Sequence, residues 1–186
     1  MAERTLRPTL WRTCRVLANQ PRLKILVLLA RRPSQTVTAI ARQLRLSVPA
    51  ASQYLRALEA RGLLEARRAG PHVEYRSSSA AAAGITPELA AALRKTLEQG
   101  DGSIETVFSV ATAFTHPRRI EILRVLNTKT RSLAQLQHAT LISSRALRRH
   151  LQKLVSRGFV TLRRGDYVAA YPTNRLAREL KRLALG

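Results

Sequence analysis

Apolar residues recur at helical spacing along most of this chain, and the pattern is sharpest over residues 47–62. At 100° per residue, Ala51, Leu55 and Leu58 fall on one face, with Tyr54 at its edge. Pro49, Gln53 and Arg56 point the other way, flanked by Ser52 and Ala50. The pattern therefore predicts one helix with a buried stripe and a separate exposed face.

The residues at both ends of this helix match its expected limits. Ser47 is a favourable N-cap, Pro49 fits the first turn, and Gly62 suits a left-handed residue after the end. Periodicity predicts further helices over 10–19, 21–30 and 37–44, a turn over 31–35, strands over 63–68 and 73–76, and an amphipathic helix over 86–99. This order of elements is typical of a winged helix-turn-helix, with residues 47–62 as its DNA-recognition helix.

The whole pattern occurs twice. Residues identical at an offset of 96 are Ser47, Ala50, Leu55, Leu58, Arg61 and Gly62 with Ser143, Ala146, Leu151, Leu154, Arg157 and Gly158. Closer to the start of each unit the offset is 97, which pairs 22–26 with 119–123. In the wings, Arg67, Arg68 and Tyr75 match Arg163, Arg164 and Tyr171, and the second loop, Gly165–Asp166, is expected to be shorter.

The predicted fold is mainly α with small β-hairpin wings, as two winged helix-turn-helix domains in tandem, related by a pseudo-twofold axis. Domain 1 covers residues 1–84, with a wing at 63–76 and a Ser/Ala-rich linker at 77–84. Residues 85–102 form a linking amphipathic helix. Domain 2 covers 103–186 and ends in an amphipathic helix over 174–185, the repeat of 86–99.

Charge indicates the partner. The 33 basic and 11 acidic residues give a net charge of +22. Residues 1–85 and 86–186 each carry a net +11, so two equally basic domains are expected to face a polyanion, which favours double-stranded DNA. A membrane surface fits less well, because no basic helix is also broadly apolar.

Other chemistry has little support. The single Cys14 excludes an internal disulfide and predicts a reducing cytoplasm, with nucleoid association. Cys14 is expected to be a buried hydrophobe, with a redox role as the alternative. Histidines at 72, 116, 138 and 150 lack metal-ligand spacing, and His150 is expected to pack. No catalytic set, cofactor site, signal segment or membrane span is predicted.

Residues 17–29 followed by 47–64 resemble the ArsR-type winged-helix transcription regulators, and residues 116–126 resemble the same opening motif in the second unit. Family members typically carry one unit and dimerise through flanking helices. The resemblance therefore implies a fused version of that dimer. The metal-sensing members' cysteine motif is missing at 47–49 and at 143–145, and the last helices contain no His, so metal sensing is not implied.

Gln53 is the expected base-reading residue of the first recognition helix, because its amide can pair with adenine in a major groove about 12 Å wide. Val48 or Ala50 could touch a thymine methyl, and Arg56 is expected to hold phosphate. The predicted DNA-binding residues of this unit are Ser47, Val48, Pro49, Ala50, Ser52, Gln53, Arg56 and the wing residues Arg67 and Arg68.

The second recognition helix has a more basic face, in which Arg145, Arg148 and Arg149 replace Pro49, Ser52 and Gln53. Arginines favour guanine edges or phosphates, although they could form only a solvated face. The predicted DNA-binding residues here are Ser143, Ser144, Arg145, Arg148, Arg149, Gln152, Arg163 and Arg164.

Three functions stay open. The leading prediction is a sequence-specific transcription regulator that uses two recognition helices from one chain. The alternatives are an architectural, largely non-specific nucleoid protein, and a chain in which one unit serves protein interaction. The flanking helices could pair within one chain or between two chains.

Overall fold

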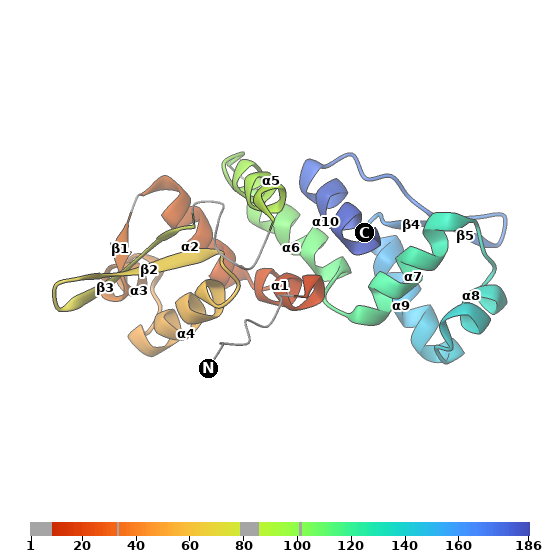
Figure 1. Ribbon diagram of the computed structural model, residues 1–186, viewed down its shortest axis with the longest axis horizontal. Coiled ribbons are helices and arrows are strands. Elements are labelled where there is room, and N and C mark those ends of the chain that lie inside the picture. The colour runs from red at the N-terminus through yellow and green to blue at the C-terminus, as the bar shows by residue number, and fades with distance from the viewer. Residues whose placement is uncertain (1–8, 33, 79–85, 101) are drawn as a thin grey trace, which may run out of the picture.

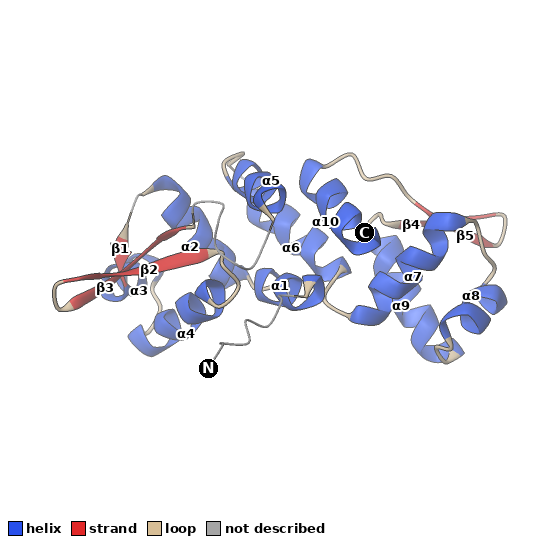
Figure 2. Cartoon of the chain, in the orientation of Figure 1, coloured by secondary structure: helices blue, strands red, loops and turns tan. Residues whose placement is uncertain are grey.

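The computed structural model of the protein describes residues 9–32, 34–78, 86–100 and 102–186 (Figure 1). The first half contains α1 (Leu10–Leu17), α2 (Gln20–Arg31), β1 (Gln35–Thr36), α3 (Val37–Leu44), α4 (Val48–Glu59), β2 (Leu64–Ala69), β3 (His72–Ser77) and α5 (Pro87–Leu97). The second half contains α6 (Ser103–Ala113), α7 (Pro117–Thr128), α8 (Leu133–Thr140), α9 (Ser144–Ser156), β4 (Val160–Arg163), β5 (Asp166–Ala169) and α10 (Arg175–Leu185). The protein is mainly helical with small antiparallel hairpins, as predicted (Figure 2).

Polar side chains fix where many of the helices begin. Each accepts a hydrogen bond from a backbone N–H of the first turn, which satisfies a group that the helix itself leaves unpaired. These caps are Asn19, Thr36, Ser47, Thr86, His116, Ser132 and Asn174. In α2, α4, α5 and α7 a proline occupies the first or second helical position. Backbone N–H groups there have no partner within the helix, so the N–H that proline lacks is not missed.

The first wing belongs to a three-stranded sheet of order β1-β3-β2, which corrects the prediction of two strands. Gln35 was predicted to lie in a turn, but it pairs with Tyr75 of β3. Two residues are too short for an alternating pattern, and the partner strand is distant in sequence. The helix-turn-helix is thereby joined to the wing through hydrogen bonds between β1 and β3.

The strands of the second wing are shorter than those of the first wing, but the turns of the two wings are equally long. Arg164 and Gly165 form a two-residue turn with φ of 51° and 89°, so the predicted Gly165–Asp166 loop is wrong by one residue. Positive φ at both turn positions matches the twist of a tight hairpin. The first wing also turns over two residues, Gly70 and Pro71.

Strand register also corrects the matching of the tyrosines. Ala66 pairs with Tyr75 in the first wing, and Leu162 pairs with Tyr167 in the second. Tyr167 is therefore the counterpart of Tyr75. Tyr171, which the sequence repeat had matched to Tyr75, lies beyond β5 and is 90% exposed.

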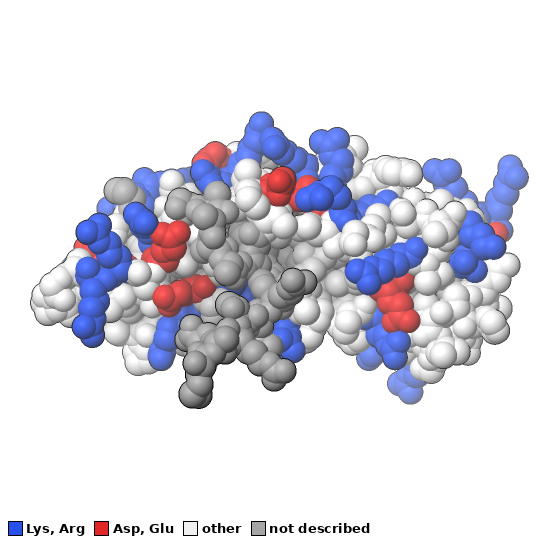
Figure 3. Space-filling model, in the orientation of Figure 1, with Lys and Arg blue, Asp and Glu red and all other residues white. Residues whose placement is uncertain are grey.

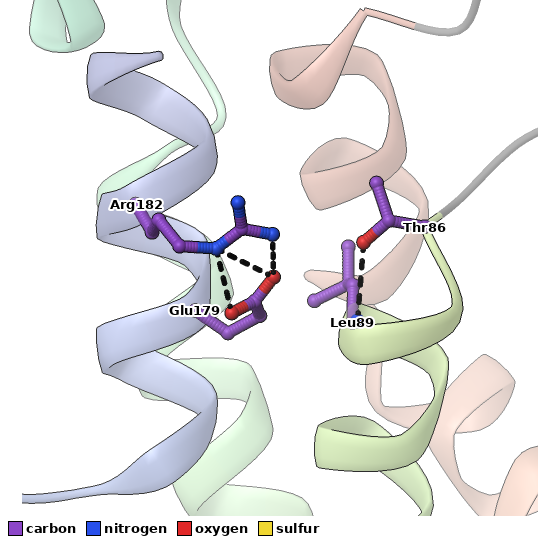
Figure 4. Close-up of polar contacts among 4 residues, drawn as sticks. All are labelled: Thr86, Leu89, Glu179 and Arg182. Atoms are coloured by element: carbon purple, nitrogen blue, oxygen red, sulfur yellow. Dashed lines mark hydrogen bonds and ion pairs between the residues drawn. The ribbon is translucent and has the colours of Figure 1, made fainter.

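The buried hydrophobic residues form one cluster that runs through both halves. Near the middle of the elongated molecule, α5, α6 and α10 pack together with α1, and the wings lie at opposite ends (Figure 1). Figure 4 shows Glu179 and Arg182 of α10 beside Thr86 and Leu89 at the start of α5. Arg182 Nη2 donates to Glu179 Oε1 at 2.6 Å, and Leu89 N–H donates to Thr86 Oγ1 at 3.3 Å.

The predicted domain limits fall partly on residues outside the described ranges, which include residues 1–8 and most of the predicted linker. The linking helix predicted within 85–102 is present as α5, and its predicted apolar face is buried at Leu89, Leu93 and Leu97. The division into domains 1–84 and 103–186 stays a prediction. No helix among the described residues is long and apolar enough to cross a membrane.

Candidate nucleic-acid interface

The helix predicted to be the first recognition helix, α4, has the predicted register. Ala51, Leu55 and Leu58 are fully buried, and Tyr54 is half-buried at the edge of this face. Ser47 caps the helix, with its Oγ accepting the Ala50 N–H at 3.3 Å. Because the buried stripe fixes the rotation of the helix, the polar face is fixed as well.

The predicted DNA-binding residues of the first half are all accessible. Val48 is 48% exposed, an unusual position for a large apolar side chain. Ser47, Pro49, Gln53, Arg56, Arg67 and Arg68 are exposed, and Ala50 and Ser52 are half-buried. The accessible side chains from Ser47 to Gln53 are uncharged. The first charged one, Arg56, lies about one helical turn after Gln53.

The predicted second recognition helix, α9, buries Leu147, Leu151 and Leu154, in the same register as α4. Its outward face carries a dense row of arginines. Ser143, Arg145, Arg148, Arg149 and Gln152 are exposed, and Ser144 is half-buried. Unlike Ser47, Ser143 makes no side-chain capping bond. The two helices therefore share a framework and present different chemistry.

The wing arginines lie near the tips of the hairpins. Arg67 faces Glu74 across the first wing, and Arg163 faces Asp166 across the second. Arg164 occupies the turn with φ of 51°, so its side chain is carried at the tip of the hairpin. All four wing arginines, Arg67, Arg68, Arg163 and Arg164, are exposed. Tips of this kind can reach a nucleic-acid backbone or minor groove.

A buried arginine holds α7 to the end of α6. Arg119 Nε donates to the Ala113 carbonyl at 2.7 Å, and its Nη2 donates to the Thr112 carbonyl at 3.0 Å and to Thr115 Oγ1. These groups satisfy carbonyls that the end of a helix leaves unpaired. The Arg119 side chain thus fixes the angle at which α7, and the α9 helix packed on it, leaves the central helices.

Arg22 occupies the equivalent position in the first half and is held less tightly. Its Nη1 donates to the Val16 carbonyl at 3.4 Å, and its guanidinium lies 5.6 Å from the centre of the Tyr54 ring. The Nε of Arg22 is buried and has no hydrogen-bond partner among the described residues. In both halves an arginine near the start of the second helix binds one or more backbone carbonyls of the preceding segment, but Arg119 makes more hydrogen bonds than Arg22.

Two histidines connect the start of α7 to α9. His116 Nδ1 caps α7 by accepting the Arg118 N–H at 3.1 Å, and its ring centroid lies 4.6 Å from that of His150. His150 is buried, which confirms its predicted packing role. Burial, reinforced by His116 and nearby arginines, lowers the pKa of His150 to about 4. Partial burial and nearby arginines also lower the pKa of His116. Both rings are therefore neutral at physiological pH.

Cys14 is fully buried in α1, and burial raises the pKa of its thiol well above the usual range. A buried neutral thiol is a poor nucleophile, so its packing role is confirmed and the redox alternative is wrong. Within the described ranges, no group of three or more His, Cys, Asp or Glu side chains is placed to hold a metal ion.

Arg15 of α1 and Arg118 of α7 were not predicted as DNA-binding residues, although both are exposed, on helices close to the middle of the molecule. Arg45 and Leu141 were also missed. They occupy equivalent left-handed positions, both with φ of 53°, in the turns before α4 and α9. Leu141 is 87% exposed where the first half has an arginine. The signal available for Arg118 was its place directly after the His116-Pro117 start of α7.

Basic side chains are spread along the visible face of the molecule, whereas acidic side chains are few (Figure 3). Three ion pairs are found among the described residues, all at least partly exposed: Glu65 with Arg76, Glu121 with Arg118, and Glu179 with Arg182. With three times as many basic as acidic residues in the chain, the positive charge cannot be neutralised internally. An extended positive surface of this kind suits a polyanion.

Comparison with known proteins supports the predicted resemblance in the first half. Residues 19–66, from the cap of α2 to the middle of β2, match the family model described as "Bacterial regulatory protein, arsR family". No curated protein matches the chain. The matched segment contains α2, α3 and α4 together with the start of the wing. Over residues 19–66 the chain is therefore similar to the helix-turn-helix domain of the ArsR family of bacterial regulatory proteins.

Proposed function

We propose that this protein is a sequence-specific transcription regulator that binds duplex DNA through two recognition helices of one chain, α4 and α9. The observation that carries the proposal is the common register of the two helices. Each buries a leucine pair at matching positions, Leu55 and Leu58 or Leu151 and Leu154, and each turns its predicted reading face outward. The second half then serves as a second winged helix-turn-helix unit, extending the family match of the first.

The central helices support the idea that one chain suffices. In a dimer of single-unit regulators, flanking helices from two chains would pair. Here α5 packs on α10 and α1 packs on α6, so each helix has its counterpart within the same chain. The predicted site is then a duplex on which α4 and α9 occupy major grooves about one turn, roughly 34 Å, apart.

The two reading faces would select different bases. The Gln53 amide can both accept from and donate to adenine, whereas Arg145 and Arg149 can donate in pairs to guanine. A site read by these faces is an imperfect palindrome or has no symmetry. This asymmetry distinguishes the proposal from a symmetric homodimer of the same domain.

Selection from random duplexes, followed by affinity measurements at physiological salt, tests the proposal. A regulator should bind its selected site at least about 10³-fold more tightly than random DNA. The mass of the free protein in solution should be that of one chain, 20.7 kDa. A selected site that is a perfect inverted repeat, together with a dimer mass, would contradict the single-chain arrangement.

The arginine face of α9 favours a second candidate, an architectural protein with little sequence preference, because Arg145, Arg148 and Arg149 can all hold phosphates. An affinity ratio within a few-fold of unity would support it. The exposed Leu141 beside α9 favours the third candidate, a protein-interaction role for the second unit. In that case, replacing the three arginines by alanine would leave DNA affinity and its salt dependence unchanged.

A further inference from the structure

Three exposed arginines lie on three helices near the place where the two halves of the chain join. They are Arg15 of α1, Arg118 of α7 and Arg149 of α9. The ring contact between His116 and His150, at 4.6 Å between centroids, holds α7 close to α9, and α1 packs on α6, the helix that leads into α7. After partial burial, the charges of Arg119 and of these three arginines are what lower the pKa of His116. Arg149 belongs to the exposed face of α9, so we call only the other two, Arg15 and Arg118, the central arginines.

The central arginines lie between the two recognition helices. In Figure 1, α4 and α9 both approach the lower edge of the molecule, and α1 and the start of α7 lie between them on that edge. The helix α5 lies on the opposite, upper edge. A duplex that crosses from α4 to α9 must therefore pass over α1 and the start of α7.

The charges at this place are poorly compensated. All the charged groups that shift the pKa of His116 are cations. Arg118 pairs with Glu121 at 2.8 Å, but this pair is exposed, with half of the Arg118 side chain open to solvent. Arg119 is committed to its carbonyl partners. Like charges held together cost free energy, and a bound anion removes that cost.

Trp11 limits how far Arg15 can turn away. The Arg15 guanidinium lies 5.7 Å from the centre of the Trp11 ring, and that of Arg12 lies 5.2 Å from it. Such contacts favour a guanidinium that stays over the ring face. Arg15 is therefore partly preorganised, which lowers the entropic cost of binding a ligand there.

We propose that the central arginines bind the DNA backbone between the two half-sites, so that the junction of the two halves is a third DNA contact. The inference rests on the proposed function. Guanidinium groups suit phosphate because they can donate two parallel hydrogen bonds. When two recognition helices enter successive major grooves, the strands bordering the intervening minor groove face the protein. Arg15 and Arg118 meet the phosphates of those strands.

The test compares two double variants from which equal charge is removed. Arg15→Gln with Arg118→Gln removes the two central arginines and leaves the recognition face of α9 intact. Arg94→Gln with Lys95→Gln is the matched control, because both residues are exposed on α5 at the opposite edge. Affinity for the selected duplex is measured across a range of salt concentrations. Melting temperatures show that both variants are folded.

For the Arg15→Gln/Arg118→Gln variant, the slope of log Kd against log salt concentration should be smaller by about 1.8, since each lost phosphate contact contributes roughly 0.9 to that slope. The control should leave this slope close to that of the unchanged protein. Equal slopes for the two variants would overturn the inference.

Altered DNA gives a second measurement, and its main comparison, between two duplexes, uses only the unchanged protein. Neutral methylphosphonate linkages are placed at the centre of the selected duplex. They should weaken binding of the unchanged protein several-fold and hardly affect the Arg15→Gln/Arg118→Gln variant. If the unchanged protein tolerates neutral central linkages, the third contact is absent although the regulator function stands. If the unchanged protein has no preference for any duplex, the proposed function itself fails.

Discussion

The ring of His150 lies 4.6 Å, centroid to centroid, from that of His116, and the buried Nδ1 of His150 has no hydrogen-bond partner among the described residues. The folded protein thus resists protonation of His150, whose pKa falls to about 4. In the unfolded chain an ordinary histidine takes up its proton near pH 6.5. Between these values the unfolded state binds more protons, so the free energy of unfolding should fall as pH falls from about 6.5 to about 4.

Urea unfolding at a series of pH values checks this expectation, and His150→Tyr is the informative variant. Tyr54 occupies the equivalent position in α4, so a tyrosine ring suits the site in the first half. The variant should lose much of the pH dependence between about 6.5 and 5, a range above the titration of ordinary carboxylates. Identical pH profiles for the variant and the unchanged protein would show that His150 is not responsible.

Arg119 should contribute more to stability than Arg22, its counterpart. Arg119→Ala leaves the Ala113 and Thr112 carbonyls without their guanidinium donors, whereas Arg22→Ala removes one long bond at 3.4 Å. An unsatisfied buried group costs about 1 to 3 kcal/mol. We expect Arg119→Ala to lower the free energy of unfolding by roughly 3 kcal/mol and Arg22→Ala by about 1 kcal/mol. Equal losses in denaturant titrations would contradict this interpretation.

Exchange of one reading residue should transfer base preference between the half-sites. Gln53 and Arg149 occupy equivalent exposed positions on α4 and α9. Gln53→Arg should shift selection in the first half-site from adenine towards guanine, by about 1 to 3 kcal/mol of discrimination. The control is Arg56→Gln, at the predicted phosphate contact, which should weaken binding to all sequences about equally. A Gln53→Arg variant that selects the original site unchanged would exclude Gln53 from base reading.

The shared core predicts that the two halves unfold together. The helix α6 of the second half packs against α1 and α2 of the first. Phe114, directly after α6, is fully buried and meets Phe159 edge-on, with centroids 4.8 Å apart. Phe114→Ala should cost about 3 to 5 kcal/mol. Trp11, the single tryptophan, reports on α1 by fluorescence, while circular dichroism reports on all helices. Both signals should change in one transition, shifted equally by the variant. Two separate transitions would show that the halves fold independently.

Much of the fold could be predicted from local sequence patterns. The positions of α3 and α4 follow from leucine spacing and from capping residues such as Ser47, because a helix is stabilised by contacts between near neighbours. The exposed residues of α4 and α9 follow from the same spacing. Both helices were therefore predicted in the correct register, although the DNA contacts of their side chains stay a prediction.

The errors arose where pairing joins segments distant in sequence. Gln35 and Thr36 form a strand only because β3 lies alongside. A two-residue segment has no sequence pattern from which a strand can be predicted. The match of Tyr75 to Tyr171 assumed a constant repeat, whereas each strand of the second wing is two residues shorter. A deletion of this kind becomes visible only through strand register. The central arginines were missed for the same reason, because only the folded chain brings the charges of Arg15 and Arg118 near His116.

The different outward faces of α4 and α9, with wings of unequal length, have a consequence for gene control. Under the proposed function, the protein has a front and a back along the DNA axis. A symmetric dimer binds its operator equally well in either orientation, but this chain would bind in one direction only. Inverting the operator relative to a promoter would exchange the half of the protein that faces the start of transcription. Two unequal halves in a single chain can therefore encode polarity, which two identical chains cannot.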